Sequence, residues 1–255
     1  MTETGFAFSR DGFRIAYSTC GAGPPLLLLH GFGGDRSLWR THGWLERLQP
    51  DFTVITMDLR GCGQSTASSK PEDYVVGHHL ADVDAVLHAC GVAQFRFWGW
   101  SFGATIGLHL AACSPRPTRV VIAGTYFGRL FTEEFVQPRV RQIEQLIQAQ
   151  QDGTLHLLEL SPAMQALATE SNLPLYLART RGLASWPGIE PGDVRCPALI
   201  YTGTRDGNVV LRLRRQEAAI RAAGLQLTVF DGLNHIQLLS ESDVIWPEVH
   251  QFLCR

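Results

Sequence analysis

The sequence predicts an α/β fold: a mostly parallel eight-stranded sheet flanked by helices, with an inserted helical cap. Three observations support this prediction. Short apolar runs alternate with helical patterns, an order typical of parallel sheets. Some of these runs are apolar throughout, as in strands that are buried on both faces. One long segment, residues 128–195, interrupts the alternation without a convincing strand.

Eight short segments have strand patterns. Phe6–Ser9 and Phe13–Tyr17 alternate in hydrophobicity and are joined through Asp11-Gly12, a hairpin signal that makes the sheet mixed. Pro24-Pro25 precedes the continuous apolar run Leu26–Leu29, which fits a strand inside a parallel sheet. The remaining five expected strands are Phe52–Met57, Phe95–Trp98, Val120–Ala123, Ala198–Tyr201 and Leu225–Phe230.

Helical patterns lie between these strands. In one of them, Leu80, Val83 and Leu87 recur at the spacing of a single helix face. The expected core helices are Trp39–Leu48, His79–Ala89, Ala104–Ala112, Arg212–Ala223 and Asp243–Leu253.

The segment 128–195 has helix signals of its own. Thr132 precedes apolar residues at helical spacing, and Ser161-Pro162 and Asn172-Leu173-Pro174 are typical helix starts. We therefore expect a core domain of residues 1–127 and 196–255, and a helical cap of residues 128–195 that covers a site. A purely structural helical subdomain is the alternative.

The composition is that of an ordinary globular protein, with 45% hydrophobic and 18% charged residues among 255. The formal net charge is −2 and no Lys/Arg run occurs, so we expect neither nucleic acid nor a membrane surface as a partner. No apolar stretch approaches the roughly 18 residues of a membrane helix. The first residues, Met1–Thr4, lack an apolar signal core, which favours a cytoplasmic protein.

Cysteine and histidine patterns suggest no metal and no cofactor. The 6 cysteines are scattered without a Cys-x-x-Cys pair, so free thiols are expected; Cys62, in a glycine-flanked loop, is the one to watch. His78, His79 and Asp82 could suggest a metal site, but a helix start with ordinary polar residues explains them. Neither a dinucleotide fingerprint nor a P-loop is present.

A candidate nucleophile lies in the stretch Gly99-Trp100-Ser101-Phe102-Gly103, between an apolar run and a small, helix-like segment. This is the strand–turn–helix context of a nucleophile elbow. The turn holds the serine in a strained conformation, and glycine neighbours let the strand and the helix pack closely. We therefore predict Ser101 as the nucleophile of a serine hydrolase.

A serine hydroxyl needs a base that takes its proton, and the base needs an orienting carboxylate. His235 follows the last expected strand, and Asp206 follows the strand before it. Loops at the carboxyl ends of parallel strands open on the same edge of the sheet as the elbow. We predict His235 as the general base and Asp206 as its partner; Asp231 and Asp193 are the rival carboxylates.

Acyl transfer also needs donors for the oxyanion. The backbone N–H of Phe102, directly after the nucleophile, is one, and the N–H of Phe32 in the loop His30-Gly31-Phe32-Gly33-Gly34 is the other. His30 is expected to support this loop. The substrate pocket is predicted to include Gly31, Trp100, Tyr126 and Phe127.

The chain resembles the α/β-hydrolase superfamily from about Phe13 to Leu253. The resemblance rests on the order Ser101, Asp206, His235, on His30-Gly31, and on the turn Asp58–Ser65, which is similar to a structural turn of that family. It implies a serine carboxylic-ester hydrolase that acts through an acyl-enzyme on a small-molecule ester or lactone, without a cofactor.

Departures from neighbouring families narrow the function. The elbow carries Ser101, whereas epoxide hydrolases and haloalkane dehalogenases need a carboxylate nucleophile. Ile236-Gln237-Leu238-Leu239 differs from the tryptophan-containing segment of carbon–carbon bond hydrolases. A carboxylesterase or lactonase is the leading hypothesis. A ligand-binding, receptor-like member with little turnover, an acyltransferase, and a carbon–carbon bond hydrolase on the same triad are the alternatives.

Overall fold

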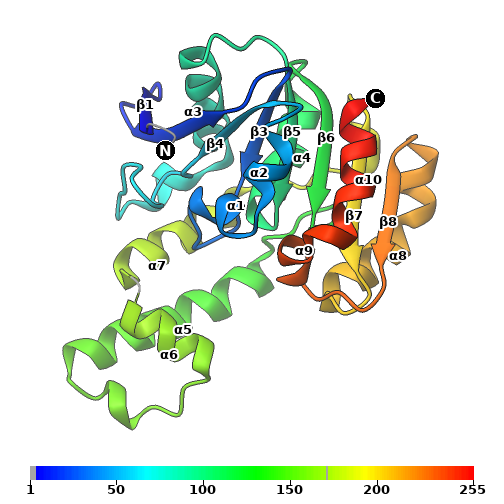
Figure 1. Cartoon of the computed structure of the whole chain (residues 1–255). Helices are drawn as coiled ribbons and strands as arrows, with labels where there is room; N and C mark the ends of the chain where they lie inside the picture. The colour runs from blue at the N-terminus through cyan, green and yellow to red at the C-terminus, as the bar shows by residue number, and fades with distance from the viewer. Residues whose placement is uncertain (1–3, 171) are drawn as a thin grey trace.

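The computed structural model describes residues 4–170 and 172–255, which contain one eight-stranded sheet with the strand order β1-β2-β4-β3-β5-β6-β7-β8. β1 and β2 are antiparallel to their neighbours, and β3 to β8 run parallel. The predicted fold class is thereby confirmed (Figure 1). The strands are β1 (Thr4–Phe8), β2 (Arg14–Cys20), β3 (Pro25–Leu29), β4 (Thr53–Met57), β5 (Phe95–Trp100), β6 (Pro117–Ala123), β7 (Ala198–Gly203) and β8 (Gln226–Phe230).

Helices cover both faces of the sheet. The α-helices of the core are α1 (Ser37–Thr41), α2 (Trp44–Leu48), α3 (Val76–Ala89), α4 (Phe102–Cys113), α8 (Gly207–Ala222), α9 (Gln237–Ser240) and α10 (Ser242–Cys254). Between β6 and β7 lie α5 (Glu133–Gln151), α6 (Pro162–Glu170) and α7 (Leu173–Gly182). Short 3₁₀ turns are η1 (Pro71–Tyr74), η2 (Leu155–Leu157), η3 (Leu183–Ser185) and η4 (Pro191–Asp193).

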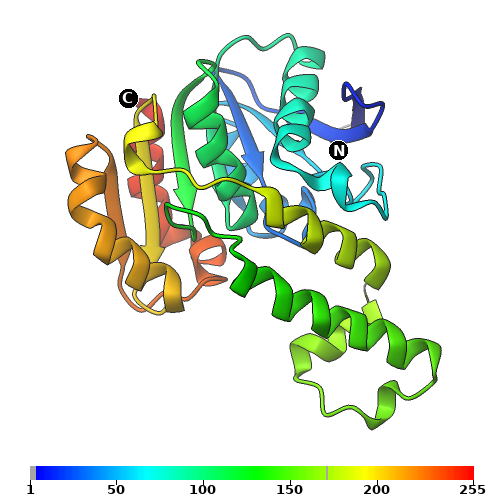
Figure 2. The ribbon, with the colours of Figure 1, turned by 180° about the vertical axis from the view of Figure 1, so that it is seen from behind.

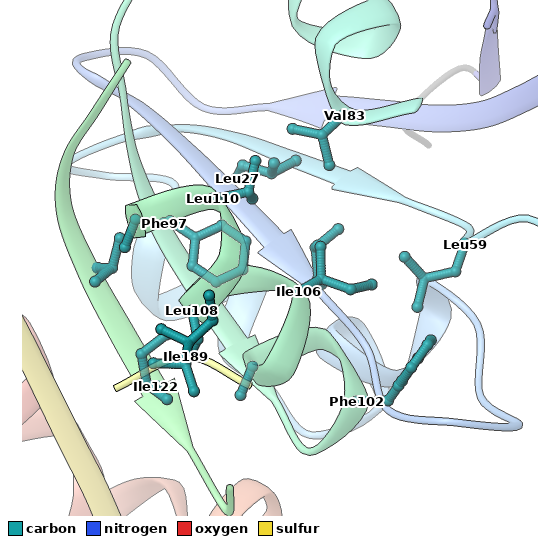
Figure 3. Close-up of a cluster of buried hydrophobic side chains, with 14 of the residues drawn as sticks. Leu27, Leu59, Val83, Phe97, Phe102, Ile106, Leu108, Leu110, Ile122 and Ile189 are labelled. Carbon is teal, nitrogen blue, oxygen red and sulfur yellow. The ribbon is translucent and has the colours of Figure 1, made fainter. Parts of the chain in front are cut away.

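The inner strands are apolar throughout because each face of the sheet has its own core. Along β3, Leu27 and Leu29 join one apolar cluster, while Leu26 and Leu28 join the other. The first cluster packs against α3, α4 and α8, and Figure 3 shows part of it around Phe97. The second packs against α1, α2 and α10. Because β3 to β8 run parallel, their carboxyl ends, and the loops that follow them, lie at one edge of the sheet.

One expected helix was wrong. The predicted helix Trp39–Leu48 is split into α1 and α2, because Gly43 between them adopts φ 73°, in the left-handed region that ends a helix. The Gly43 amide donates to the carbonyl of Arg40, which closes the last turn of α1. The break lets Trp39 and Trp44 both pack against Trp98 in the second cluster.

The segment between β6 and β7 leaves and rejoins the core at one place, where Gly128 and Ile189 pair in an isolated β-bridge. Its helices project from the edge where the parallel strands end (Figures 1 and 2). Thr132 occupies the N-cap position of α5, though its side chain makes no capping bond. The Asn172 side chain accepts a hydrogen bond from the Leu175 amide at the start of α7. That this segment works as a lid stays a prediction.

Within residues 4–170 and 172–255, no helix combines the length and the apolar character that crossing a membrane requires.

Candidate active site

Ser101 sits at the sharp junction between β5 and α4. It is the one non-glycine residue with positive φ among the described residues, at φ 56° and ψ −114°. Such backbone conformations are costly for an L-residue and concentrate at functional sites. A Cβ added at Gly99 would lie 2.5 Å from the Gly103 carbonyl carbon, and one at Gly103 would lie 2.3 Å from the Leu29 carbonyl oxygen. The glycines are therefore required by the close approach of β3, β5 and α4.

A continuous hydrogen-bond chain connects three predicted residues. His235 Nδ1 lies 2.9 Å from Asp206 Oδ1, and His235 Nε2 lies 2.9 Å from Ser101 Oγ. An ionised carboxylate only accepts, so Nδ1 carries the proton and donates it to Asp206. Nε2 is then free to accept from the Ser101 hydroxyl. This is the tautomer that a general base needs.

Asp206 is held from several sides. Its side chain is buried, and its Oδ2 accepts a hydrogen bond from the Thr202 hydroxyl at 2.9 Å. The loop that carries it is tied to the loop before His235, since the Arg205 amide donates to the Leu233 carbonyl. The rival carboxylates lie elsewhere: Asp231 accepts from the Thr204 hydroxyl, and Asp193 accepts from the Glu190 amide.

Trp100 supports His235 from behind. Its indole N–H donates to the His235 carbonyl at 3.0 Å, and the two rings lie 5.1 Å apart. Gly124 adopts φ 67°, and an added Cβ there would lie 3.0 Å from His235 Cε1. The imidazole is therefore confined between the Trp100 ring and the backbone after β6.

The two predicted oxyanion donors lie beside the nucleophile. Phe102 opens α4, so its amide has no partner inside the helix. Phe32 lies in the loop after β3, and its ring contacts the ring of Phe102 edge-on at 5.3 Å. At Gly31, an added Cβ would lie 3.3 Å from Ser101 Cβ, so this loop runs directly past the serine. The oxyanion role of these amides stays a prediction.

His30 supports the loop, as expected from the sequence. Its Nδ1–H donates to the Gly31 carbonyl at 2.8 Å, and its Nε2 accepts from the Leu59 amide at 3.1 Å. Burial lowers the pKa of His30 to about 4, so the ring is neutral at neutral pH. The turn Asp58–Ser65 closes beneath it, where the Ser65 hydroxyl donates to the Asp58 carbonyl.

A cavity of about 710 Å³ opens above the serine. Ser101, His235, Phe32 and Phe102 form its floor. Most of its wall comes from the segment between β6 and α8, and no Asp or Glu is among the described lining residues. These wall residues are Gly124, Thr125, Tyr126, Leu130, Phe131, Phe135, Pro138, Arg139, Gln142, Ile143, Met164, Leu167, Tyr176, Thr180 and Leu183.

Three of the four predicted pocket residues need correction. Tyr126 lines the cavity, but Gly31, Trp100 and Phe127 do not. Phe127 is 1% exposed and belongs to the core cluster that includes α4 and α8. The Trp100 side chain packs behind His235 and donates a hydrogen bond to its carbonyl, and Gly31 packs against the Trp100 ring. The sequence analysis expected a cap over the site but named no wall residue from α5 to α7, where the helical spacing of Phe135 and Ile143 was the available signal.

The residues considered for a metal point to different partners. His79 is buried between the rings of Phe102 and Trp186, at 5.4 and 5.3 Å. Asp82 pairs with Arg60 at 2.6 Å, and His78 contacts Asp11 at 3.0 Å. Cys62 is a free, buried thiol whose pKa is raised by desolvation, which disfavours the nucleophilic thiolate.

The chain is similar in sequence to several known proteins. A family model described as the alpha/beta hydrolase fold matches residues 24–125. Epoxide hydrolase 4 of Mus musculus is 31% identical over 48% of this chain and 34% of its own length. A pimeloyl-[acyl-carrier protein] methyl ester esterase of Xanthomonas campestris is 26% identical over 91% of this chain and 96% of its own length. The chain spans between 34% and 44% of the length of the first curated relatives that it matches.

Solved structures share the fold over nearly the full chain. An enol-lactonase from Burkholderia xenovorans superimposes with a TM-score of 0.76 at 23% identity, over 98% of this chain and 100% of that one. At this level of identity, the likeness concerns the fold alone.

Proposed function

We propose that this chain, which has the α/β-hydrolase fold, is a serine hydrolase of small-molecule carboxylic esters or lactones. The observation that carries this proposal is the hydrogen-bond chain from Asp206 through His235 to Ser101, with 2.9 Å at each link. Two further features support it: the strained serine and the cavity directly above it. Epoxide opening is disfavoured, because it needs a carboxylate where this chain has Ser101.

The proposed reaction has two halves. Ser101 Oγ attacks the substrate carbonyl while His235 Nε2 takes its proton, and Asp206 stabilises the imidazolium that forms. The amides of Phe32 and Phe102 bind the tetrahedral oxyanion. His235 then protonates the leaving alcohol, and an acyl-enzyme remains. Water, deprotonated by the same histidine, releases the acid and restores the serine.

The cavity favours a substrate with an apolar body. Aromatic and aliphatic side chains of α5 and α6, among them Phe135, Ile143 and Leu167, form much of the wall. The Xanthomonas relative, named as an esterase, supports an ester bond as the target. We also propose that residues 128–195 act as the cap of a core made of residues 1–127 and 196–255, since α5 to α7 stand over the serine.

The test uses p-nitrophenyl esters from acetate to dodecanoate with the wild-type protein and Ser101→Ala. We expect turnover with an optimum in acyl length, and a loss of about 10⁴-fold or more in kcat for the alanine variant. A rapid-mixing experiment should show a burst of p-nitrophenolate equal to the enzyme concentration.

The matched control is Ser69→Ala, which changes an exposed serine and should leave turnover unchanged. Turnover in Ser101→Ala equal to that of the wild type would overturn the proposal. Tight ligand binding with a single slow turnover would instead favour a receptor-like member. Transfer of the acyl group to added alcohols in preference to water would favour an acyltransferase.

A further inference from the structure

Arg179, in the last turn of α7, is a buried cation without an acidic partner. The residue is 5% exposed, and its Nη2 makes no hydrogen bond. Among the described residues, no carboxylate oxygen forms an ion pair with its guanidinium. A buried charge left unpaired costs folding free energy, and the carbonyls at the end of α7 offset this cost only in part. Such a group calls for a function.

The contacts of Arg179 lead to the oxyanion loop. Its guanidinium carbon lies 4.2 Å from the centre of the Phe32 ring. The same ring meets Phe102 edge-on at 5.3 Å and Tyr176 of α7 at 5.1 Å. Helix α7 therefore places a cation and an aromatic ring on the residue whose amide is the proposed oxyanion donor.

The position of Arg179 is fixed by the core. At Gly182, three residues further on, an added Cβ would lie 2.6 Å from the Pro71 carbonyl oxygen, so the end of α7 packs tightly on η1. The Trp186 indole N–H then donates to the Tyr74 carbonyl at 3.0 Å. The arginine stem also lies against Gly61, whose added Cβ would be 3.1 Å from Arg179 Cδ. The guanidinium cannot swing into solvent without moving this end of the helix.

The charge of Arg179 also acts on two buried histidines, His30 of the oxyanion loop and His79 beside Phe102. It helps to lower the pKa values of His30 and His79, for which burial is the larger cause, so neither histidine adds a second charge at neutral pH. Two carboxylates, Asp58 and Asp35, act on His30 in the opposite sense, and each also has a partner of its own. Asp58 is ion-paired with Arg36, and Asp35 accepts from the Ser37 amide.

We propose that Arg179 is a positioning residue that makes the oxyanion site of Phe32 more positive and holds Phe32 in place. The proposal rests on the proposed function, since it needs an oxyanion to act on. In the ground state the carbonyl oxygen carries little charge, and the buried cation stays uncompensated. In the transition state the oxyanion provides the missing negative charge inside a low-dielectric site. The favourable interaction thus appears mainly in the transition state, which raises kcat rather than substrate affinity. The cap segment would contribute to chemistry as well as cover the site.

The experiment compares Arg179→Met and Arg179→Lys with the wild type in p-nitrophenyl butyrate hydrolysis. We expect Arg179→Met to lower kcat by about 10- to 100-fold, less than the loss of a direct oxyanion donor, with KM within about twofold. Arg179→Lys, which keeps the charge, should retain at least about a third of kcat. Inhibition by butylboronic acid, whose serine adduct is a tetrahedral anion, should weaken in Arg179→Met by the same factor as kcat.

Stability separates this role from a structural one. Because Arg179→Met removes an unpaired buried charge, its Tm should be unchanged or higher by about 2–4 °C. Arg181→Met is the matched control: Arg181 lies in the same turn, is exposed and pairs with Glu144. Its kcat should equal that of the wild type.

Three results would overturn the inference. They are a wild-type kcat in Arg179→Met, an equal loss in Arg179→Lys and Arg179→Met, and a fall in Tm that parallels the loss of kcat. If the wild type itself shows no Ser101-dependent turnover, the proposed function fails first, and the inference fails with it.

Discussion

The active site has two halves that are built in different ways. The core half consists of the loops after β3, β5, β7 and β8, which carry Phe32, Ser101, Asp206 and His235. The cap half consists of α5 to α7, which supply most of the cavity wall. In the core half the atoms of Ser101, Asp206 and His235 are fixed by hydrogen bonds, and glycines permit close approach around them. In the cap half the wall is made mainly of apolar side chains, with Arg139, Gln142 and Thr180 among them.

The difference indicates a division of labour. Reacting groups need positions defined within a fraction of an ångström, which strained backbone and hydrogen bonds provide. A wall that selects substrates needs only shape and hydrophobicity, so many sequences would serve. Arg179 is the exception, since it lies on a cap helix and contacts the oxyanion residue Phe32. Single substitutions can test this division, from the largest expected effect to the smallest.

The strongest test of the core half is Asp206→Asn. The amide cannot hold the His235 tautomer or stabilise the imidazolium, so kcat should fall by about 10³- to 10⁴-fold, while the geometry is kept. Steady-state hydrolysis of p-nitrophenyl butyrate measures this loss. Asp231→Asn, at the exposed rival carboxylate, should stay within about twofold of the wild type. A larger loss of kcat in Asp231→Asn than in Asp206→Asn would show that Asp231, and not Asp206, is the carboxylate of the triad.

Gly103→Ala tests whether close backbone approach builds the elbow. The new methyl group would lie 2.3 Å from the Leu29 carbonyl oxygen, which cannot move without distorting β3. We expect the free energy of unfolding to fall by about 3 kcal/mol. Denaturant unfolding of Gly77→Ala provides the contrast, because nothing lies within 4 Å of an added Cβ there. That variant should gain up to about 1 kcal/mol in helix propensity. Equal stability of the two variants would contradict the account.

The buried histidine His109 should make the stability of the protein depend on pH. Burial lowers the pKa of His109 to about 4, below its ordinary value of 6.5. Between these two values the unfolded chain binds a proton that the folded chain does not, so stability falls as the pH drops from about 6.5 to 4. This one histidine accounts for about 3 kcal/mol of that fall.

The check is urea unfolding at pH 7 and pH 4. The difference in unfolding free energy should shrink by about 3 kcal/mol in His109→Leu. It should stay at the wild-type value in His88→Leu, which changes an exposed histidine. If the difference in unfolding free energy between pH 7 and pH 4 is as large in His109→Leu as in the wild type, the buried His109 ring does not cause the acid sensitivity.

Met164→Trp tests the cap half and carries the smallest expected effect. The larger side chain should fill part of the cavity wall of α6 and exclude long acyl chains. We expect kcat/KM for the decanoate ester to fall about tenfold relative to the acetate ester, with little change for acetate. Leu211→Trp, on the exposed face of α8, should leave the ratio unchanged. A uniform loss for both esters would place α6 in the catalytic half.

The sheet could be predicted from the sequence because each inner strand is apolar on both of its faces. The run Leu26–Leu29 is apolar at every position since alternate residues enter the two clusters, a pattern that surface strands lack. The break at Gly43 was missed, because a glycine inside an apolar helical pattern is compatible with a continuous helix until packing is known.

The catalytic residues of the candidate site could be predicted from the sequence, because their chemistry requires particular residue types. The pocket and positioning residues could not. Ser101, Asp206 and His235 follow from their order and their places after strands, and the structure brings them within hydrogen-bond distance. Phe127 was assigned to the pocket wrongly, since its position after β6 does not reveal that the ring faces the core. Arg179 carried no local signal at all. Its importance depends on the packing of α7 against a loop that is far away in the sequence.

The role of Ser101 as the activated nucleophile is tested most directly by labelling with diethyl p-nitrophenyl phosphate. Intact-mass and peptide analysis should find one diethylphosphoryl group on the peptide that contains Ser101, with one equivalent of p-nitrophenolate released. The label should be absent from Ser101→Ala. Ester hydrolysis by a protein that takes no label, or takes it on another residue, would contradict the account.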